Sequence, residues 1–403
     1  MSDGGYRLYS SLEDIGVSQK LARIDLCALR ENYRILRKSL SQRKPDLRLI
    51  CVVKADAYGH GARACVHALL DEGCTFFAVS CIEEAIAVRA SCDEKGADAE
   101  ILILGYTDPS LAYLLGRHGL TQTLLSAEYA RRLDKAAEAA GVRLLTHVAI
   151  NTGMNRIGFD ARTDEECAIS AHAIERVCAL PSLDVRGMFT HYARADETEE
   201  SGKAATRLQT ARYSALLRAL EERGVRIPLH HTCNSAAALG GEAELFDGVR
   251  LGIVLYGAAR FLHAGLNLRP VMRLEAKILH TYTLIPGECV GYGGTFDAET
   301  EREIAVIGIG YADGWLRAYR GAKLLLKTRD GVHYVPMVGN VCMDQCMLDV
   351  TGTGARVGDT VTLFGGESAD QLSSLSSRAG SIDYEALCLI SSRVLRVYND
   401  FEK

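Results

Sequence analysis

The chain has 403 residues, with 46 Lys and Arg against 51 Asp and Glu, a formal net charge of -5 and a pI near 6.2. This length exceeds one average domain and fits a barrel of about 250 residues plus a smaller domain. The basic residues are scattered and leave no positive stripe for a phosphate backbone, which argues against nucleic acid as a partner.

Neither a membrane segment nor a metal site is expected. No run of 18 apolar residues is present, and the start, Met-Ser-Asp-Gly-Gly-Tyr, lacks the features of a signal peptide. We therefore expect a cytoplasmic protein. The 13 cysteines include no C-x-x-C pair, which indicates reduced thiols. Cys342 and Cys346 are four residues apart, but no histidine or second pair stands near them to complete a metal site.

After residue 46, eight short apolar runs recur, and each is followed by a segment with helical periodicity. The runs are Leu47–Val53, Phe76–Ser80, Ile101–Leu104, Thr123–Ser126, Leu144–Ile150, Val185–Tyr192, Ile227–His231 and Val249–Tyr256. The helical period is clear in Ser201–Gly224, with Gly224 as the stop. Apolar strands that alternate with amphipathic helices indicate a parallel sheet covered by helices, and eight such units predict a closed β/α barrel.

Beyond about residue 265 the pattern changes to alternating apolar and polar residues with glycine turns, such as Pro286-Gly287 and Asp330-Gly331. This pattern predicts an antiparallel β region. Near the start, Leu21–Leu26 fits a strand that joins this second domain. The prediction is thus an α/β protein: an eight-stranded β/α (TIM-like) barrel over residues 20–265 and a C-terminal antiparallel β domain over residues 266–403, which residues 1–19 join.

The first barrel strand ends on a lysine. Residues 51–61 read Cys-Val-Val-Lys-Ala-Asp-Ala-Tyr-Gly-His-Gly, so Lys54 follows the apolar run directly. A desolvated lysine amine at a strand end can condense with an aldehyde, which makes Lys54 a candidate Schiff-base lysine. The alternative is a surface lysine just past a strand.

Polar residues also follow later strands, at the end of the barrel where chemistry gathers. After the fifth strand, the loop 151–158 carries Arg156, which can bind a carboxylate through two hydrogen bonds or simply be solvated. The sixth strand ends at His191, either a catalytic group or a core histidine that orients a neighbour.

The last two strands offer a phosphate site. Asn234 and Ser235 follow the seventh run, and Gly252 and Ile253 lie in the eighth. Small residues and backbone N–H groups at these ends can cradle a phosphate. Arg250 then points toward the barrel mouth. Because a guanidinium accepts no proton, Arg250 can donate a hydrogen bond to a bound group there but cannot take a proton from it.

Two segments stand out in the β domain, residues 310–315 and 338–345. A reaction that exchanges a proton on both faces of a planar carbanion needs an acid or base on each face, and Lys54 could serve only one face. Tyr311 is the candidate for the other face; the alternative is a tyrosine packed at a strand end.

The segment Val-Lys-Ala-Asp-Ala-Tyr-Gly-His-Gly resembles the pyridoxal-phosphate attachment segment of alanine racemases, and the later motifs match this family in order from about residue 20 to the carboxyl end. The resemblance implies pyridoxal 5'-phosphate on Lys54 and a homodimer with composite active sites, in which Tyr311 comes from the other subunit. It further implies that Tyr58, Ser235, Gly252, Ile253 and Tyr384 hold the phosphate, and that Asn234 is a further cofactor-binding residue. Arg250 would face the pyridine nitrogen, with His191 as its hydrogen-bond partner, and would leave that nitrogen unprotonated, which favours simple proton exchange over transamination. On the substrate side, the resemblance implies Arg156, the Met343 backbone and Asp344.

The sequence departs from the family at the position that often carries a carbamylated lysine, which is Ala149 here. A bound anion, or the side chains of Asn151 and Asn155, would then brace Arg156. The predicted activity is interconversion of L- and D-alanine by two bases on a pyridoxal-phosphate Schiff base, for peptidoglycan precursor supply. Tyr384 favours alanine over serine, since related serine racemases have an asparagine there. The alternatives are a serine or broad-specificity racemase and a non-catalytic pyridoxal-phosphate homeostasis protein.

Overall fold

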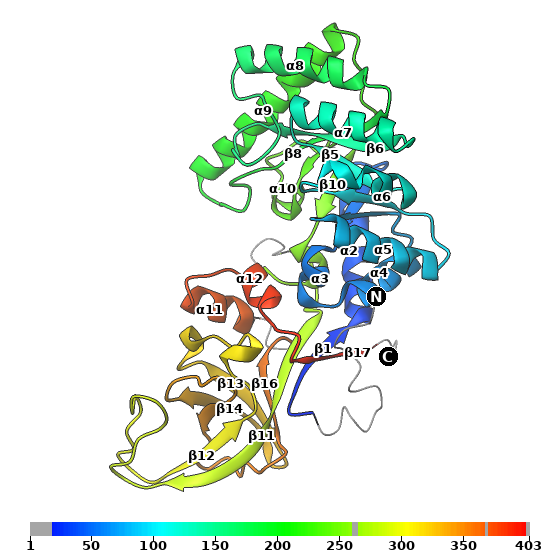
Figure 1. The fold of residues 1–403 in the computed structure, drawn as a ribbon. Coiled ribbons are helices and arrows are strands. Elements are labelled where there is room, and N and C mark those ends of the chain that lie inside the picture. Colours follow the sequence, from blue (N-terminus) through cyan, green and yellow to red (C-terminus); the bar gives the residue numbers. More distant parts are fainter. Residues whose placement is uncertain (1–17, 260–264, 367–369, 400–403) are drawn as a thin grey trace. The chain divides into compact units, whose positions relative to one another are not determined.

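The computed structural model describes residues 18–259, 265–366 and 370–399 (Figure 1). The chain divides into two compact units. Among the described residues, 29–255 and 265–268 form the first, which we call the barrel unit. Residues 18–28, 256–259 and 269–399 form the second, the β unit.

The barrel unit is built on eight parallel strands that close on themselves. Neighbouring strands pair in the order β5-β4-β3-β2-β10-β9-β8-β6, and β5 also pairs with β6. The eight-stranded β/α barrel is therefore confirmed. The strands are β2 (Arg48–Val52), β3 (Phe76–Val79), β4 (Glu100–Ile103), β5 (Thr121–Leu124), β6 (Leu144–Asn151), β8 (Leu183–Thr190), β9 (Leu229–Cys233) and β10 (Gly248–Leu251), with a short β7 (Phe159–Asp160) beside β6.

Helices alternate with these strands along the chain (Figure 1). Several of them begin at side-chain caps: Ser126 accepts a hydrogen bond from Tyr129 N, Thr163 from Glu166 N, Asp108 from Ser110 N, and Asn234 from Ala237 N. The helical elements are α2 (Leu26–Arg43), α3 (Lys54–Gly59), α4 (Ala62–Asp71), α5 (Ile82–Glu94), η1 (Pro109–Leu111), α6 (Ala112–Arg117), α7 (Ala127–Ala139), α8 (Asp164–Cys178), α9 (Glu200–Glu222), α10 (Ser235–Gly240) and η2 (Ile253–Tyr256).

The predicted bounds of the last two barrel strands differ from the observed ones. β9 runs two residues further than predicted, to Cys233, and β10 ends at Leu251 rather than Tyr256. Residues 253–256 instead form the 3-10 turn η2, in which Leu255 N donates to Gly252 O at 2.9 Å. Because these four residues are fully buried, a hydropathy pattern cannot distinguish the turn from a strand.

The β unit contains a mainly antiparallel sheet in the order β12-β15-β14-β13-β16-β11-β1-β17, in which β12 also pairs with β11. β1 pairs antiparallel with β11 and parallel with β17, so residues 20–25 belong to this sheet rather than to the barrel range of the prediction. Its elements are β1 (Lys20–Asp25), β11 (Met272–Leu284), β12 (Arg302–Ile307), η4 (Tyr311–Asp313), η5 (Arg317–Tyr319), β13 (Lys323–Thr328), β14 (Gly331–Val338), β15 (Cys346–Asp349), β16 (Thr360–Phe364), α11 (Asp370–Arg378), α12 (Asp383–Cys388) and β17 (Leu395–Asn399).

Within the described ranges, no helix combines the length and apolar character needed to cross a membrane. In the same part of the chain, no three His, Cys, Asp or Glu side chains gather in a way that would hold a metal ion.

Candidate active site

Lys54 lies two residues after the end of β2, at the start of an unusual backbone turn. The four residues from Ala55 to Tyr58 have φ between 52° and 55° and ψ between 42° and 51°, which is the left-handed helical region. This conformation costs an L-residue about 1–2 kcal/mol. Glu84, on α5, helps to hold the turn: its carboxylate accepts hydrogen bonds from Ala55 N at 2.7 Å and from Ser80 N at 2.8 Å.

The turn brings the side chain of Tyr58 against the end of β10. Tyr58 is 6% exposed. A Cβ atom built on Gly252 would lie only 2.5 Å from the Tyr58 hydroxyl, so only glycine leaves room for this hydroxyl. On the other side, Gly252 N donates to Ser235 Oγ at 2.9 Å. Two hydroxyls and the buried backbone of Gly252 and Ile253 thus come together, which are the groups that bind phosphate oxygens.

Arg250 is buried in the middle of this strand end. Its guanidinium donates to the carbonyls of Thr190 at 2.7 Å and Thr232 at 3.0 Å, and to both the carbonyl and Nδ1 of His231, the latter at 3.0 Å. Its carbon Cζ lies 5.1 Å from the centre of the Phe189 ring. Burial lowers the pKa of Arg250 to about 10, so the side chain keeps its charge at neutral pH.

His191 follows β8 and contacts Arg250, as predicted for its hydrogen-bond partner: Nδ1 of His191 lies 3.3 Å from Nη2 of Arg250. Nε2 of His191 lies 3.4 Å from the Asn234 amide. Burial lowers the pKa of His191 well below its usual range. The positive charges of Arg250, Arg156 and Lys54 act in the same direction. His191 is therefore neutral, and its surroundings are electropositive.

Arg156 lies exposed on the loop after β6. Both asparagines that we considered as its brace bind the loop itself. Asn151 Oδ1 accepts from Asn155 N at 2.9 Å, and Asn151 Nδ2 donates to Asn155 Oδ1 at 3.2 Å and to Asp160 Oδ1 at 2.7 Å. Ala149 is buried in β6 and offers no polar side-chain group. These contacts fix the loop without placing an acceptor on the Arg156 guanidinium.

The remaining candidates belong to the β unit. Tyr311 opens η4, and its side chain is 41% exposed. Tyr311 N donates to Cys342 O and Ala312 N donates to Met343 O, both at 3.0 Å. A Cβ atom on Gly310 would approach Met343 O to 2.3 Å. The two segments that stood out in the sequence therefore lie against each other, with Tyr311 beside Met343.

A buried carboxylate holds this junction. Asp313 is fully buried and accepts hydrogen bonds from Lys20 Nζ at 2.7 Å and Gly310 N at 3.0 Å. Arg393 Nε lies 3.3 Å from the same carboxylate, and Arg393 also donates to Asp344 at 2.6 Å. Asp313 and Asp344 are therefore linked through one arginine.

Tyr384 lies in the first turn of α12 and is half-buried. The preceding residue, Asp383, fixes this turn, because its carboxylate accepts hydrogen bonds from Ala259 N at 2.9 Å and Ser373 Oγ at 2.8 Å.

Two family models match the chain: the alanine racemase N-terminal domain over residues 24–260 and the alanine racemase C-terminal domain over residues 271–398. The alanine racemase of Desulfovibrio desulfuricans is 39% identical over 383 residues, which cover 94% of this chain and 97% of that protein. The chain belongs to the alanine racemase family. The resemblance that we identified from the motifs is thus confirmed.

Solved alanine racemases share the architecture. The structure from Clostridium difficile is 34% identical and superposes with a TM-score of 0.84, covering 95% of this chain and 96% of that one. The Bacillus anthracis structure, with bound L-Ala-P, is 30% identical with a TM-score of 0.82, covering 95% of each chain.

Two residues that support the site in this racemase family member, Glu84 and His231, were not predicted from the sequence. Glu84 supports the turn after Lys54, yet it sits in an ordinary acidic stretch at the start of a helix and carries no distinctive signal. His231, in β9, supports Arg250 because its Nδ1 and its carbonyl oxygen both accept hydrogen bonds from the guanidinium. A histidine inside an apolar strand is the signal that would have identified it.

Proposed function

We propose that this protein interconverts L- and D-alanine, with pyridoxal 5'-phosphate on Lys54 and with Lys54 and Tyr311 as the two bases. The observation that carries the proposal is the arrangement at the carboxyl ends of β2, β9 and β10. There a lysine, a phosphate-type cradle and a buried arginine lie at one end of one barrel. When bound, the cofactor would hold the substrate amine covalently and withdraw electrons from its α-carbon.

The residues of the cradle fit a phosphate. Tyr58 and Ser235 supply hydroxyl groups, and Ile253 supplies a backbone N–H in a buried setting. The N–H of Gly252 is bonded to Ser235 Oγ, which leaves the Ser235 hydroxyl proton to donate to a phosphate oxygen. Asn234 caps α10 by accepting from Ala237 N at 3.0 Å and so fixes the position of Ser235. Tyr384, from the β unit, completes the predicted phosphate set. Together these groups would fix one end of the cofactor while Lys54 holds the other.

Arg250 would control the protonation of the ring nitrogen. Its guanidinium stays charged at neutral pH and has no acceptor lone pair, so it can donate to the nitrogen but cannot share a proton with it in the manner of a carboxylic acid. An unprotonated ring withdraws fewer electrons. This restricts the reaction to local proton exchange at the α-carbon.

The two bases would serve opposite faces of the α-carbon. Nζ of Lys54 would take or give the proton on one face and Oη of Tyr311 on the other. We further infer that Arg156 and the backbone N–H at Met343 hold the substrate carboxylate, beside Asp344. Tyr311 would come from the partner in a homodimer with two composite sites.

Replacement of the lysine tests the proposal. Purified protein should show a visible absorbance band that borohydride removes by fixing the cofactor covalently. Lys54→Ala should lose both the band and racemase activity, whereas Lys203→Ala, on the outer helix α9, should keep both. An active Lys54→Ala protein would exclude the proposed chemistry. Equal kcat/KM values for L-alanine and L-serine would favour the broad-specificity alternative.

A further inference from the structure

A line of buried polar groups runs through the barrel from Arg250 toward the opposite end. His231, in β9, and His147, in β6, are both fully buried inside the barrel. Nε2 of His231 lies 2.9 Å from Nδ1 of His147. Nε2 of His147 lies 3.4 Å from Oε1 of Glu100, the first residue of β4. The line therefore joins the guanidinium to a carboxylate through two imidazoles.

The hydrogen-bonding capacity of each group gives this line one direction. Arg250 can only donate, so Nδ1 of His231 must be the acceptor and its proton must sit on Nε2. That Nε2–H donates to Nδ1 of His147, which places the second proton on Nε2 of His147. Nε2 of His147 is buried and makes no hydrogen bond to the described residues. The group that lies 3.4 Å from it is the ionised carboxylate of Glu100, which can only accept. The two ends thus require the same tautomer of both histidines.

The pKa shifts agree with this assignment. Burial lowers the pKa of His147 and, more strongly, that of His231, so both imidazoles are neutral. Burial alone would raise the pKa of Glu100, but the contacts with His147 and Arg48 outweigh it and the pKa falls below its usual range. Glu100 is therefore ionised at neutral pH.

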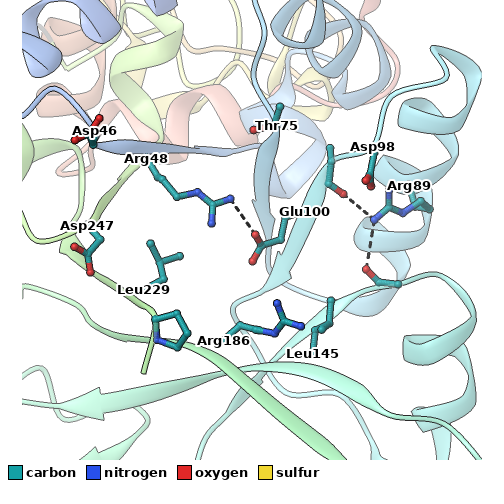
Figure 2. Close-up of a pocket in the computed structure, with 13 residues that line it drawn as sticks. Asp46, Arg48, Thr75, Arg89, Asp98, Glu100, Leu145, Arg186, Leu229 and Asp247 are labelled. Carbon is teal, nitrogen blue, oxygen red and sulfur yellow. Dashed lines mark hydrogen bonds and ion pairs between the residues drawn. The ribbon is translucent and has the colours of Figure 1, made fainter. Parts of the chain in front are cut away.

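Glu100 faces solvent at the amino-terminal end of the barrel. It lines a cavity of about 630 Å³, and its side chain is 24% exposed. Figure 2 shows Arg48 reaching across this cavity to the carboxylate, with its Nη2 3.0 Å from Oε2 of Glu100. Arg48 is itself held over the Phe76 ring, with Cζ 4.8 Å from the ring centre. One carboxylate oxygen is thus occupied by a group that only donates, which leaves the other for His147.

We propose that Glu100 is a positioning residue for Arg250. Glu100 lies at the far end of the barrel and acts on Arg250 indirectly, because it sets the tautomers of His147 and His231. With the opposite tautomers, a proton on Nδ1 of His231 would face the N–H of Arg250, and the guanidinium would lose an acceptor and its position. The consequence for racemisation rests on the proposed role of Arg250 at the ring nitrogen. The tautomer assignment does not.

Glu100→Gln tests the direction of the line. Arg48 accepts nothing, so the glutamine oxygen must face Arg48 and its NH2 must face His147. This amide should reverse both tautomers. The readout is the ¹⁵N spectrum of the histidine side chains in selectively labelled enzyme, prepared with and without cofactor and assigned with His147→Gln and His231→Gln. We expect Nδ1 of His231 to be unprotonated in the parent protein and protonated in Glu100→Gln.

A second variant distinguishes this effect from a fold defect. In Arg48→Met/Glu100→Gln, the glutamine oxygen is free to turn to His147, so the parent tautomers should return. Racemase kcat should fall about tenfold in Glu100→Gln and recover to within about threefold in the double variant. Glu275→Gln, which removes the same charge beside Arg23 and Arg273 in the β unit, should change neither measurement.

Unchanged His231 tautomers in a folded Glu100→Gln protein would overturn the proposal. So would reversed tautomers that persist in the double variant. Because the spectrum of the cofactor-free protein decides both outcomes, they are independent of whether the proposed racemase activity is correct.

Discussion

Replacement of Gly252 by alanine would place a methyl group where the hydroxyl of Tyr58 now lies. The new Cβ would be 2.5 Å from Tyr58 Oη and 3.2 Å from Cζ. To restore an ordinary contact of 3.4 Å, the hydroxyl must move by about 0.9 Å. The φ of Gly252 lies outside the left-handed region, so alanine can adopt this backbone and the steric conflict is the main effect.

The size of the effect follows from the contact that is lost. Overpacking a buried site costs about 1–3 kcal/mol. If Tyr58 donates to a phosphate, displacement of its hydroxyl removes a hydrogen bond to a charged group, worth about 1.5–3 kcal/mol. Since about 1.4 kcal/mol is a factor of ten, the Kd for pyridoxal phosphate should rise roughly 10- to 100-fold.

Equilibrium dialysis of the cofactor-free protein measures this Kd. Gly240→Ala, in the neighbouring helix α10, is the control, because its Cβ would meet nothing closer than 3.9 Å. Tyr58→Phe should weaken binding to a similar extent, and Gly252→Ala should add little to it, since the clashing oxygen is already gone. A Gly252→Ala protein that binds within about twofold of the parent (about 0.4 kcal/mol) would show that the Tyr58 hydroxyl does not hold the phosphate. Fully additive losses in the double variant would lead to the same conclusion.

Three further predictions concern Tyr311 and Asp313 of the β unit, and one concerns Arg156. Tyr311→Phe should slow the L-to-D and D-to-L directions unequally, and an equal loss of less than about threefold, or 0.6 kcal/mol, would make Tyr311 a packing residue only. A mixture of inactive Lys54→Ala and inactive Tyr311→Phe subunits should regain part of the activity, because one composite site of each heterodimer keeps both groups. If activity does not recover after subunit exchange has been proven, both bases lie in one chain. Asp313→Asn should lower stability by about 3 kcal/mol, because it removes a fully buried carboxylate charge that pairs with Lys20 and Arg393. Asp344→Asn, at the exposed end of the same arginine, should cost less than about 1 kcal/mol. Thermal unfolding compares the two variants, and equal losses would show that burial of the Asp313 pair does not matter. If a bound anion braces Arg156, activity should fall when chloride is exchanged for a large, weakly coordinating anion at constant ionic strength, and activity indifferent to the anion would remove this explanation.

Much of the fold was predictable because its signals are local. The eight barrel strands are short apolar runs set between helical periods, and a parallel strand buried on both faces requires that pattern. Lys54 and Arg250 could be identified for a related reason: each is a cation in or directly after an apolar run, where a charge is costly without a specific role.

The rest depended on contacts between distant parts of the chain. Ala-Asp-Ala-Tyr, residues 55–58, has no glycine, and the sequence indicated only the opening of a helix there. The left-handed turn is stabilised by Glu84, about 30 residues away. The tautomers of His147 and His231 depend on Glu100, which in sequence is an ordinary acid at the start of a strand. The roles of Glu84 and Glu100 cannot be predicted from the sequence, because their contacts form only in the folded barrel.

The pairing of β1 with β17 has a consequence for how the protein is made. β1 ends at Asp25, while its parallel neighbour begins at Leu395, so the ribosome must add about 370 residues before this edge of the sheet can form. At synthesis rates of about 5–20 residues per second, that delay is roughly 20–70 s. Every barrel strand, from β2 to β10, emerges earlier as one continuous stretch ending at Leu251. The barrel can therefore begin to fold on the nascent chain before β11 and β17, the two strands that pair with β1, have been synthesised.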